Sequence, residues 1–193
     1  DLNQNNDDTV DDFYQSGKTI HNRSESLIKF VSDFRNMTRI KHPTLEIHEV
    51  EDMMKQILVL LKPDIEAANI DVNCSIKPNL SINIDREQIE QVVINVVKNA
   101  VQALEASEKD MKSLTITAME NEGGGAFISV ADNGTGIEEE ALKKIFIPFF
   151  TTKKNGSGIG LSLSKQIMRK HGGNITAKSQ IGIGTEFLLK FAS

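Results

Sequence analysis

The stretch that decides the fold is Asp132-Asn133-Gly134-Thr135-Gly136-Ile137, which follows an apolar segment at 127–131 that is predicted to be a strand. Its two glycines allow the backbone to turn sharply and to approach a ligand closely. A carboxylate at such a strand end can accept a hydrogen bond from an exocyclic amine, so the stretch is typical of a purine pocket. A simple turn closed by the Asp132 side chain is the alternative interpretation.

Upstream of this stretch, residues 85–104 are predicted to form a helix with an apolar face and an amide face, beginning at a capping-box-like pair, Asp85 and Gln88. The amide face carries Asn95, Asn99 and Gln102. Asn is a poor helix former, so two in one stripe suggest a function. Amide oxygens are suitable ligands for Mg²⁺. A solvated helix face is the alternative.

Downstream, a second glycine-rich loop, Gly156-Ser157-Gly158-Ile159-Gly160-Leu161, opens a helix predicted to reach Lys170. Backbone N–H groups of such a loop converge on an anion, and the helix dipole favours negative charge there. The spacing matches neither the P-loop nor the dinucleotide fingerprint, and by itself it could be a flexible surface loop.

The remaining elements alternate between strand and helix patterns. A strand is also expected near each of 45–48, 70–76, 80–84, 114–119, 174–178 and 185–191, and a helix over 51–68 and 138–145. Gly123, Gly124 and Gly125 indicate a hairpin turn, and Pro63 is expected to kink or split its helix. The product is an α+β sandwich with helices on one face of a sheet.

The N-terminal residues 1–43 have a different pattern from the rest of the chain. Residues 1–9 have no apolar periodicity, whereas 10–40 have a narrow apolar seam that predicts a helix ending before Pro43. Such a helix has little to pack against in its own chain, so we expect it to pair with another helix or chain. We therefore expect an appendage at 1–43 and a main domain at 44–193.

Composition excludes several function classes. The formal net charge of −5 disfavours a nucleic-acid-binding surface. No apolar run approaches the length of a membrane span and no signal peptide is recognisable, so we expect a cytoplasmic fragment without membrane contact. The single cysteine, Cys74, is predicted to be a buried, inert strand thiol.

Taken in order, these motifs resemble the ATP-binding domain of sensor histidine kinases, in the superfamily that includes gyrase B. The resemblance extends from about Leu45 to Phe191 and includes a terminal element, Gly184-Thr185-Glu186-Phe187. A Phe box is formed by Phe146, Pro148, Phe149 and Phe150. Residues 149–153 and 99–104 are most similar to the nitrogen-sensor branch. The family fold implied is a two-layer sandwich with a mixed, mostly antiparallel sheet covered on one face by helices.

The resemblance also implies a site for ATP and Mg²⁺. Asn99 would bind the metal, Asn95 would position metal or phosphates, and Asp132 would read the adenine amine. The nucleotide-contacting set expected is Asn95, Asn99, Gln102, Asp132, Gly134, Gly136, Ile137, Phe149, Thr151, Thr152, Lys153, Gly156, Ser157, Gly158, Ile159, Gly160, Leu161 and Thr185. Residues 149–160 would form a lid. Lys98, Lys153 and Lys154 are expected to place positive charge near the phosphates, while Gln102 stands where many relatives carry a lysine.

The implied activity is transfer of the ATP γ-phosphate to a histidine on a helical domain not included in the chain, for relay to a response regulator. Expected partners are the phosphoacceptor helices, a receiver domain and, through the N-terminal helix, a second copy. None of His21, His42, His48 and His171 has the surroundings of a phosphoacceptor. We expect residues 20–40 to be a remnant of the second helix of the phosphoacceptor region.

Two alternative functions are open. A relative that phosphorylates serine or only hydrolyses ATP would not need the N-terminal helix. A non-enzymatic nucleotide-binding module would not need the complete set of motifs.

Overall fold

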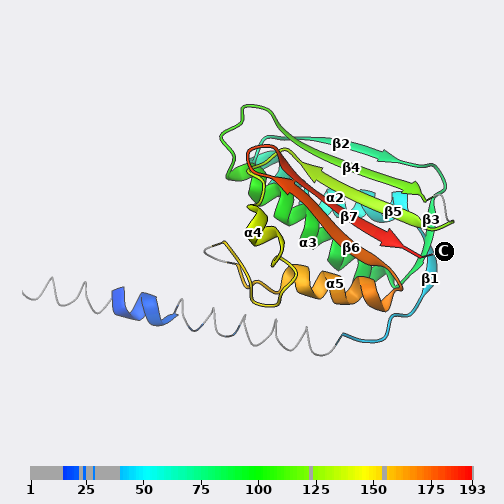
Figure 1. Cartoon of the computed structure of the whole chain (residues 1–193), viewed down its shortest axis with the longest axis horizontal. Helices are drawn as coiled ribbons and strands as arrows, with labels where there is room; N and C mark the ends of the chain where they lie inside the picture. Colours follow the sequence, from blue (N-terminus) through cyan, green and yellow to red (C-terminus); the bar gives the residue numbers. More distant parts are fainter. Residues whose placement is uncertain are drawn as a thin grey trace, which may run out of the picture. The chain divides into compact units, whose positions relative to one another are not determined.

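A computed structural model describes residues 15–21, 24, 28, 40–121, 124–153 and 156–192. The chain divides into two compact units, Asp1–Ile40 and Lys41–Ser193. In the first unit residues 15–21, 24 and 28 are helical and exposed (Figure 1), and Ile40 is half-buried and outside the helix. The rest of the helix predicted at 10–40 lies outside the described residues. The second unit contains every element discussed below.

A five-stranded sheet forms one layer of the second unit (Figure 1). Its strands, in spatial order, are β2 (Ile70–Ile76), β4 (Lys112–Glu120), β5 (Ala126–Asp132), β7 (Gly184–Phe191) and β6 (Asn174–Gln180). The β2–β4 pair is parallel and the other three pairs are antiparallel. The predicted mixed, mostly antiparallel sheet is therefore confirmed. A separate antiparallel pair joins β1 (Glu46–Glu49) to β3 (Ser81–Ile84).

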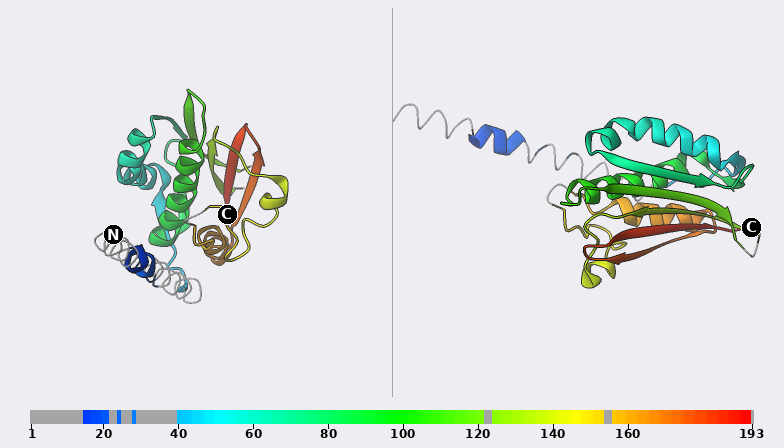
Figure 2. Two further views of the ribbon diagram at one scale, coloured as in Figure 1. Left: turned by 90° about the vertical axis from the view of Figure 1, so that its left-hand side faces the viewer. Right: turned by 90° about the horizontal axis from the view of Figure 1, so that it is seen from above.

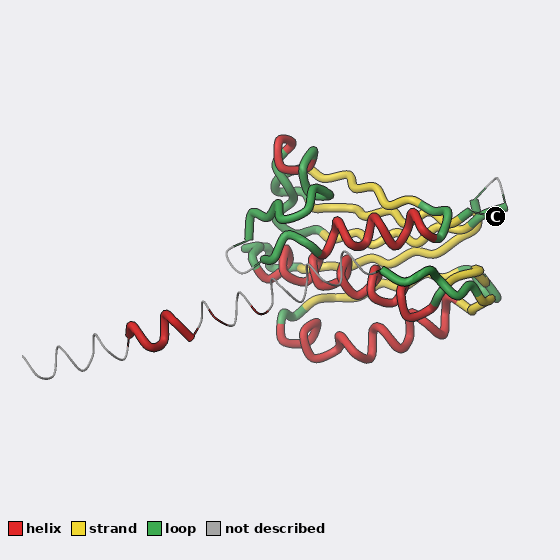
Figure 3. Tube along the Cα trace, turned by 90° about the horizontal axis from the view of Figure 1, so that it is seen from below, coloured by secondary structure: helices red, strands yellow, loops and turns green. Residues whose placement is uncertain are grey.

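Three helices form the second layer, on one face of the sheet (Figures 2 and 3). They are α2 (Val50–Ala67), α3 (Arg86–Glu105) and α5 (Gly160–Lys170). The apolar face of α3 is fully buried, as are the strand residues on the helix-facing side: Ile89, Val92, Val93, Val96 and Val97 of α3, and Leu114, Ile116, Ile128, Val130 and Leu189 of the sheet. Burial of this interface, at about 25 cal/mol per Å² of apolar surface, stabilises the sandwich. The short helix α4 (Glu139–Leu142) precedes the second glycine-rich loop.

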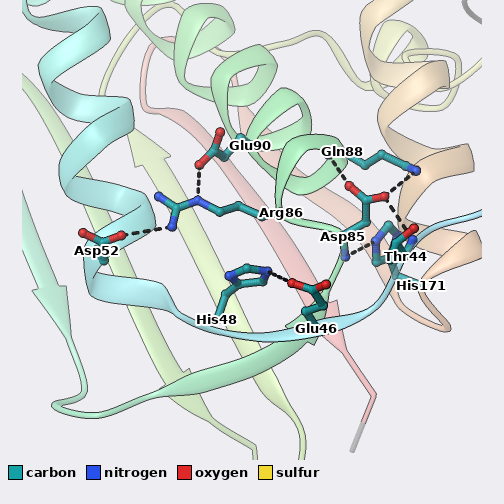
Figure 4. Close-up of polar contacts among 9 residues, drawn as sticks. All are labelled: Thr44, Glu46, His48, Asp52, Asp85, Arg86, Gln88, Glu90 and His171. Carbon is teal, nitrogen blue, oxygen red and sulfur yellow. Dashed lines mark hydrogen bonds and ion pairs between the residues drawn. The ribbon is translucent and has the colours of Figure 1, made fainter.

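The start of α3 is fixed by Asp85 (Figure 4). Its carboxylate accepts hydrogen bonds from the backbone N–H of Gln88 at 3.1 Å and of Thr44 at 3.1 Å. Its own N–H donates to Nε2 of His171 at 3.1 Å, and Nδ1 of that ring donates to the carbonyl of Ile167 at 2.8 Å. The capping-box-like start is thus confirmed. In a capping box the side chain three residues after the N-cap accepts the N-cap N–H, whereas here His171, at the end of α5, accepts it.

Two predictions about the edge of the fold are wrong. The first is the split at Pro63, since α2 continues through Pro63 to Ala67; the alternative, a kink, stays a prediction. Proline removes the hydrogen bond to the carbonyl of Val59, a residue on the exposed side of the helix. Leu61 and Ile65 remain buried against the core on either side of it, and this packing holds the helix together.

The second wrong prediction is the burial of Cys74, which is exposed. Cys74 lies in β2, and this strand is at the edge of the sheet, where only Ile70 is fully buried on the helix-facing side. Desolvation by the surrounding protein atoms, and then the charge of Glu51, raise the pKa of the thiol. The thiol therefore stays protonated at neutral pH, which agrees with the inert chemistry expected of it.

Candidate functional site

The carboxylate of Asp132 lies at the end of β5 and is only 7% exposed. Oδ1 accepts a hydrogen bond from the Gly134 N–H at 2.8 Å. Burial raises the pKa of Asp132, opposed by the backbone N–H groups of Gly134 and Thr185 and by the charges of Lys109 and Lys153. These four groups keep a negative charge tolerable in a buried position.

The loop after Asp132 is held close to two other backbones, which explains its glycines. A Cβ atom at Gly134 would lie 2.7 Å from the carbonyl of Ala103 in α3. A Cβ atom at Gly136, whose φ is +72°, would collide with the carbonyl of Gln180. The neighbouring Thr135 N–H donates to the carbonyl of Ala103 at 3.3 Å. The glycines therefore let this loop pack closely on protein backbone, and its close approach to a ligand stays a prediction.

Lys109 ties the same loop to the β6–β7 turn. Its Nζ donates to the carbonyl of Asn133 at 2.7 Å and to that of Ile183 at 3.1 Å. Asn133 in turn accepts the Ser113 N–H at 2.8 Å and donates to the carbonyl of Met111 at 2.9 Å. Sequence reasoning missed Lys109, because an isolated lysine carries no pattern that distinguishes it from a solvated one.

Thr185 of β7 pairs directly with Asp132 of β5, so the two side chains lie on the same side of the sheet. On its other side Thr185 pairs with Ser179 of β6, and the two hydroxyl oxygens are 2.9 Å apart. The Ser179 oxygen also accepts the N–H of Ile137, a predicted site residue, at 2.8 Å. Sequence reasoning missed Ser179. The only feature of the sequence that could have indicated Ser179 is its position in the strand, because the two-residue periodicity places its side chain on the inner face of the sheet.

The amide face of α3 meets two different segments. Asn95 donates from Nδ2 to the Ser164 hydroxyl of α5 at 3.0 Å, and its Oδ1 would collide with a Cβ atom added at Gly160. One turn later, Oδ1 of Asn99 accepts from Nζ of Lys153 at 2.7 Å, and Oε1 of Gln102 accepts from the same Nζ at 2.6 Å. Asn95 and Asn99 are half-buried and Gln102 is exposed. The interpretation of this face as merely solvated is therefore wrong.

The ammonium of Lys153 contacts α3 and is near enough to Asp132 for the two charges to interact. The side chain is exposed overall, yet desolvation around its charge lowers the pKa of Lys153, and the nearby charge of Asp132 opposes that change. The amide oxygens of Asn99 and Gln102 are thus already directed at a cation. Lys98 of the same helix is exposed, and Lys154 lies outside the described residues.

The loop before α5 is closed by its main chain. The Phe149 N–H donates to the carbonyl of Gly158 at 2.9 Å, and both residues have positive φ, +66° and +68°. A Cβ atom at Gly158 would lie 2.5 Å from the backbone of Phe149. The Lys153 N–H donates to the Thr151 hydroxyl at 3.1 Å, and a Cβ atom at Gly156 would collide with that hydroxyl. Glycine is thus required at Gly158, whereas at Gly156 rotation of the exposed Thr151 side chain would make room for a Cβ atom.

The start of α5 faces Asn95 without a side-chain cap. Ile159 at the N-cap is 2% exposed and supplies no capping hydrogen bond, and Leu161 follows in the first turn. Thr151 and Thr152 are exposed, and Ser157 is half-buried. Uncapped N–H groups at a helix N-terminus attract an anion. The site therefore has an acceptor end at Asp132 and Thr185 and a donor end at α5.

Over the part of the chain that the structure describes, no group of three or more His, Cys, Asp or Glu side chains could hold a metal ion. A cation here would depend on amide oxygens and on the ligand itself. In the same residues, no helix is both long and apolar enough to cross a bilayer.

Comparison with known proteins identifies a family and several similar proteins. Residues 84–193 match the family described as histidine kinase-, DNA gyrase B-, and HSP90-like ATPases. The signal transduction histidine-protein kinase AtoS of Escherichia coli (strain K12) is 34% identical over 97% of this chain. The chain spans only 30% of AtoS, so it corresponds to less than a third of that relative's length.

Two solved structures resemble the fold. Full-length ShkA in complex with AMPPNP has a TM-score of 0.75 at 26% identity, covering 92% of this chain and 38% of that one. The histidine kinase ThkA in complex with the response regulator protein TrrA has a TM-score of 0.72 at 28% identity, covering 89% and 48%.

Proposed function

The chain belongs to the family of histidine kinase-, DNA gyrase B-, and HSP90-like ATPases, and we propose that it is the ATP-binding catalytic domain of a two-component sensor histidine kinase. The observation that carries the proposal is the amide face of α3. Asn95 contacts the uncapped start of α5, and Asn99 presents its oxygen to a cation beside Asp132. This arrangement suits a nucleotide whose base lies at one end and whose phosphates lie at the other.

The base would bind at Asp132 and Thr185. The carboxylate retains acceptor capacity after taking the Gly134 N–H, so it can accept from the exocyclic amine of adenine. Gly136 and Ile137 would line the base. The complex of ShkA with AMPPNP, an ATP analogue, supports an adenine nucleotide as the ligand.

The phosphates would bind at the start of α5. Backbone N–H groups of Gly158, Gly160 and Leu161 would donate to phosphate oxygens, and the helix dipole would favour their charge. The Lys153 ammonium would move from Asn99 to the phosphates, so that phosphate oxygens replace the Asn99 oxygen as its hydrogen-bond acceptors. The exposed residues Thr151, Thr152 and Gly156, together with the half-buried Ser157, would close over the nucleotide.

Mg²⁺ fits the donors that are present. The Asn99 oxygen already accepts from an ammonium at 2.7 Å, so its lone pair faces a cation position, and amide oxygen is a ligand type that Mg²⁺ takes. Asn99 would hold the ion directly and Asn95 would position it. When bound, the ion would neutralise phosphate charge during transfer.

The phosphoryl group would pass to a histidine on a separate helical element. Transfer mainly needs positioning and charge neutralisation, so a domain can be catalytic without its own nucleophile. Both ring nitrogens of His171 are engaged, one with Asp85 and one with Ile167. We propose that residues 1–43 are a remnant of the phosphoacceptor region that can pair with a second copy, and that 44–193 are the catalytic domain.

The partner after the histidine would be the receiver domain of a response regulator. The complex of ThkA with TrrA supports this class of partner. With the parent kinase, the chain would act in the cytoplasm, its phosphoacceptor helices supplying the histidine.

The test is phosphotransfer with radiolabelled ATP. The 193-residue chain alone should acquire no acid-labile, base-stable label. Addition of the parent kinase's helical hairpin as a separate chain should label that hairpin, at a rate that rises with hairpin concentration because no tether raises the effective concentration.

A variant hairpin with its phosphoacceptor histidine changed to glutamine is the control, and it should stay unlabelled. Stoichiometric label on His21 of the chain alone would overturn the assignment of the N-terminal segment. Absence of any adenine-nucleotide binding by calorimetry would overturn the proposed function itself.

A further inference from the structure

The hydroxyl of Ser179 makes three polar contacts at once. Its oxygen lies 2.8 Å from the Ile137 nitrogen, 2.9 Å from the Gly184 carbonyl oxygen and 2.9 Å from the Thr185 hydroxyl oxygen. It therefore connects the loop after β5, the start of β7 and a predicted base-contacting side chain.

The direction of each hydrogen bond follows from counting protons. A serine hydroxyl has one proton to donate and two lone pairs to accept with. The Gly184 carbonyl can only accept, so Ser179 donates to it. The Ile137 N–H can only donate, so it takes one lone pair of the Ser179 oxygen. The Thr185 contact must then use the second lone pair, which makes Thr185 the donor.

The opposite arrangement is unfavourable. If Ser179 gave its proton to Thr185, its oxygen would face the Gly184 carbonyl oxygen at 2.9 Å with no proton between them. The Gly184 carbonyl would then lose its hydrogen bond from Ser179 and face a second acceptor, which costs free energy in a partly buried position.

Thr185 consequently acts toward any further partner only as an acceptor. Asp132, which pairs with Thr185 across the sheet, is also an acceptor when ionised. The two side chains form an edge of one polarity, and that edge complements a ligand edge that donates.

We propose that Ser179 is a specificity-determining positioning residue, which fixes the Thr185 hydroxyl as an acceptor and thereby favours a 6-amino purine over a 6-oxo purine. The proposal rests on the nucleotide-binding function above. A 6-oxo group is itself an acceptor, so against Asp132 and a fixed Thr185 it leaves acceptors facing one another. Without Ser179 the Thr185 hydroxyl can rotate and donate to the oxo group.

The test compares ADP with IDP, which differ in the 6-amino and 6-oxo groups. Calorimetric dissociation constants are measured for the wild type and for Ser179→Ala. The wild type should prefer ADP by roughly tenfold or more, the discrimination expected of one unmatched hydrogen bond. Ser179→Ala should lower the ratio severalfold, mainly by improving IDP relative to ADP, while Asp132, which is still an acceptor, keeps part of the preference for ADP.

Ser162→Ala is the matched control. Ser162 is a buried serine of α5 whose hydroxyl donates to the Ile159 carbonyl at 2.8 Å, so its loss removes a hydroxyl without touching Thr185. The ratio of the two dissociation constants should be unchanged in this variant. A merely structural role of Ser179 predicts that Ser179→Ala weakens both nucleotides equally, and that result would overturn the proposal.

A double-mutant cycle identifies Thr185 as the intermediary. In a Thr185→Val background, Ser179→Ala should have no further effect on the ratio, since Ser179 acts through Thr185. A further change in the ratio there would contradict the proposal. If Ser179→Ala does not fold, Ser179→Cys, whose thiol is a weak donor and acceptor, must lower the ratio.

The proposal and its premise fail differently. If the wild type binds neither nucleotide, the proposed nucleotide-binding function is wrong, and the Ser179 proposal falls with it. If the wild type binds ADP and IDP equally well, the function stands and the Ser179 proposal is wrong.

Discussion

Nζ of Lys153 donates a hydrogen bond of 2.7 Å to Oδ1 of Asn99, which joins the loop before α5 to the amide face of α3. The contact has a chemical meaning because the amide oxygen is the atom proposed to bind Mg²⁺. An oxygen that holds an ammonium is oriented toward positive charge, and a metal ion that replaces the ammonium needs no rearrangement of α3.

Asn99→Ala should lower ADP affinity in the presence of Mg²⁺ by about tenfold and leave metal-free ADP binding nearly unchanged, because one metal ligand is lost while the base and backbone contacts remain. Calorimetry with and without EDTA measures both values. Asn73→Ala, an exposed asparagine of β2, serves as the control. Equal losses with and without the metal would count against the ligand role of Asn99.

Asp132→Asn should weaken ADP binding by roughly ten- to hundredfold, because the carboxylate's charge-assisted hydrogen bond is lost. The same variant should melt at the wild-type temperature or above it at neutral pH. Burial raises the pKa of Asp132, so the ionised form destabilises the fold above that pKa, and asparagine carries no charge. Its amide oxygen can still accept the Gly134 N–H.

The raised pKa of Asp132 also predicts how the stability difference between the wild type and Asp132→Asn changes with pH. The folded state binds the Asp132 proton more tightly than the unfolded state does, so the wild type gains stability relative to Asp132→Asn as the pH falls through the raised pKa. Melting curves between neutral pH and about pH 4, the ordinary range of an aspartate, follow the difference. A wild type that loses stability relative to the variant over that range would refute the role of burial.

Gly184→Ala should destabilise the chain by more than about 3 kcal/mol, because a backbone clash adds to strain. Gly184 has a φ of +144°, and a Cβ atom there would collide with the carbonyl of Asp132. Gly182 is the matched control, since its φ is +73° but no atom lies within 4 Å of its added Cβ. Gly182→Ala should cost only about 1–2 kcal/mol from strain. Urea denaturation separates the two, and equal losses would exclude the clash.

Asp85→Ala should lower the free energy of unfolding by about 1–2 kcal/mol, because the N-cap of α3 is lost together with the hydrogen bond from Thr44 (Figure 4). Burial acts to raise the pKa of Asp85, but the hydrogen bonds from Thr44 and Gln88 outweigh it and the net pKa is lowered. The stabilisation is therefore present above the ordinary aspartate pKa and lost as the pH falls through the lowered one.

Asp71→Ala, which removes an exposed carboxylate of β2, is the control for Asp85→Ala. Thermal melts of the wild type and both variants at neutral and acidic pH provide the comparison. The gap between the wild type and Asp85→Ala should close in acid. A gap of the same size at both pH values would exclude capping by the ionised carboxylate.

Local patterns along the chain predicted most of the layers and the main motifs. The strand before Asp132, the amide face with Asn95 and Asn99, and the start of α3 at Asp85 depend on periodicity and capping, which act over a few residues. They could therefore be recognised before any contact between distant segments was known.

Other features depend on contacts between distant segments. Cys74 has the alternation of a buried strand, but its exposure was decided by the position of β2 at the sheet edge. Pro63 breaks a local rule, and its tolerance was decided by the packing of Leu61 and Ile65. The local conformational preference of a residue contributes less free energy than the burial of apolar side chains, so packing prevails in both cases.

Some residues of the candidate site could likewise be predicted from the sequence, and others depend on the tertiary structure. Asp132 and Thr185 could be named from the sequence, whereas Lys109 and Ser179 could not. Lys109 contacts residues 24 and 74 positions away, and the contact of Ser179 with Ile137 spans 42 positions. Ser179 reaches Thr185 only because β6 pairs with β7 in one register, and a shift of one residue would turn its hydroxyl to the opposite face of the sheet. The sequence by itself predicted the groups that are proposed to bind a nucleotide. The pairing of β5, β7 and β6 determined which hydroxyl orients which, since a hydrogen bond of 2.9 Å requires a relative placement that only the assembled sheet provides.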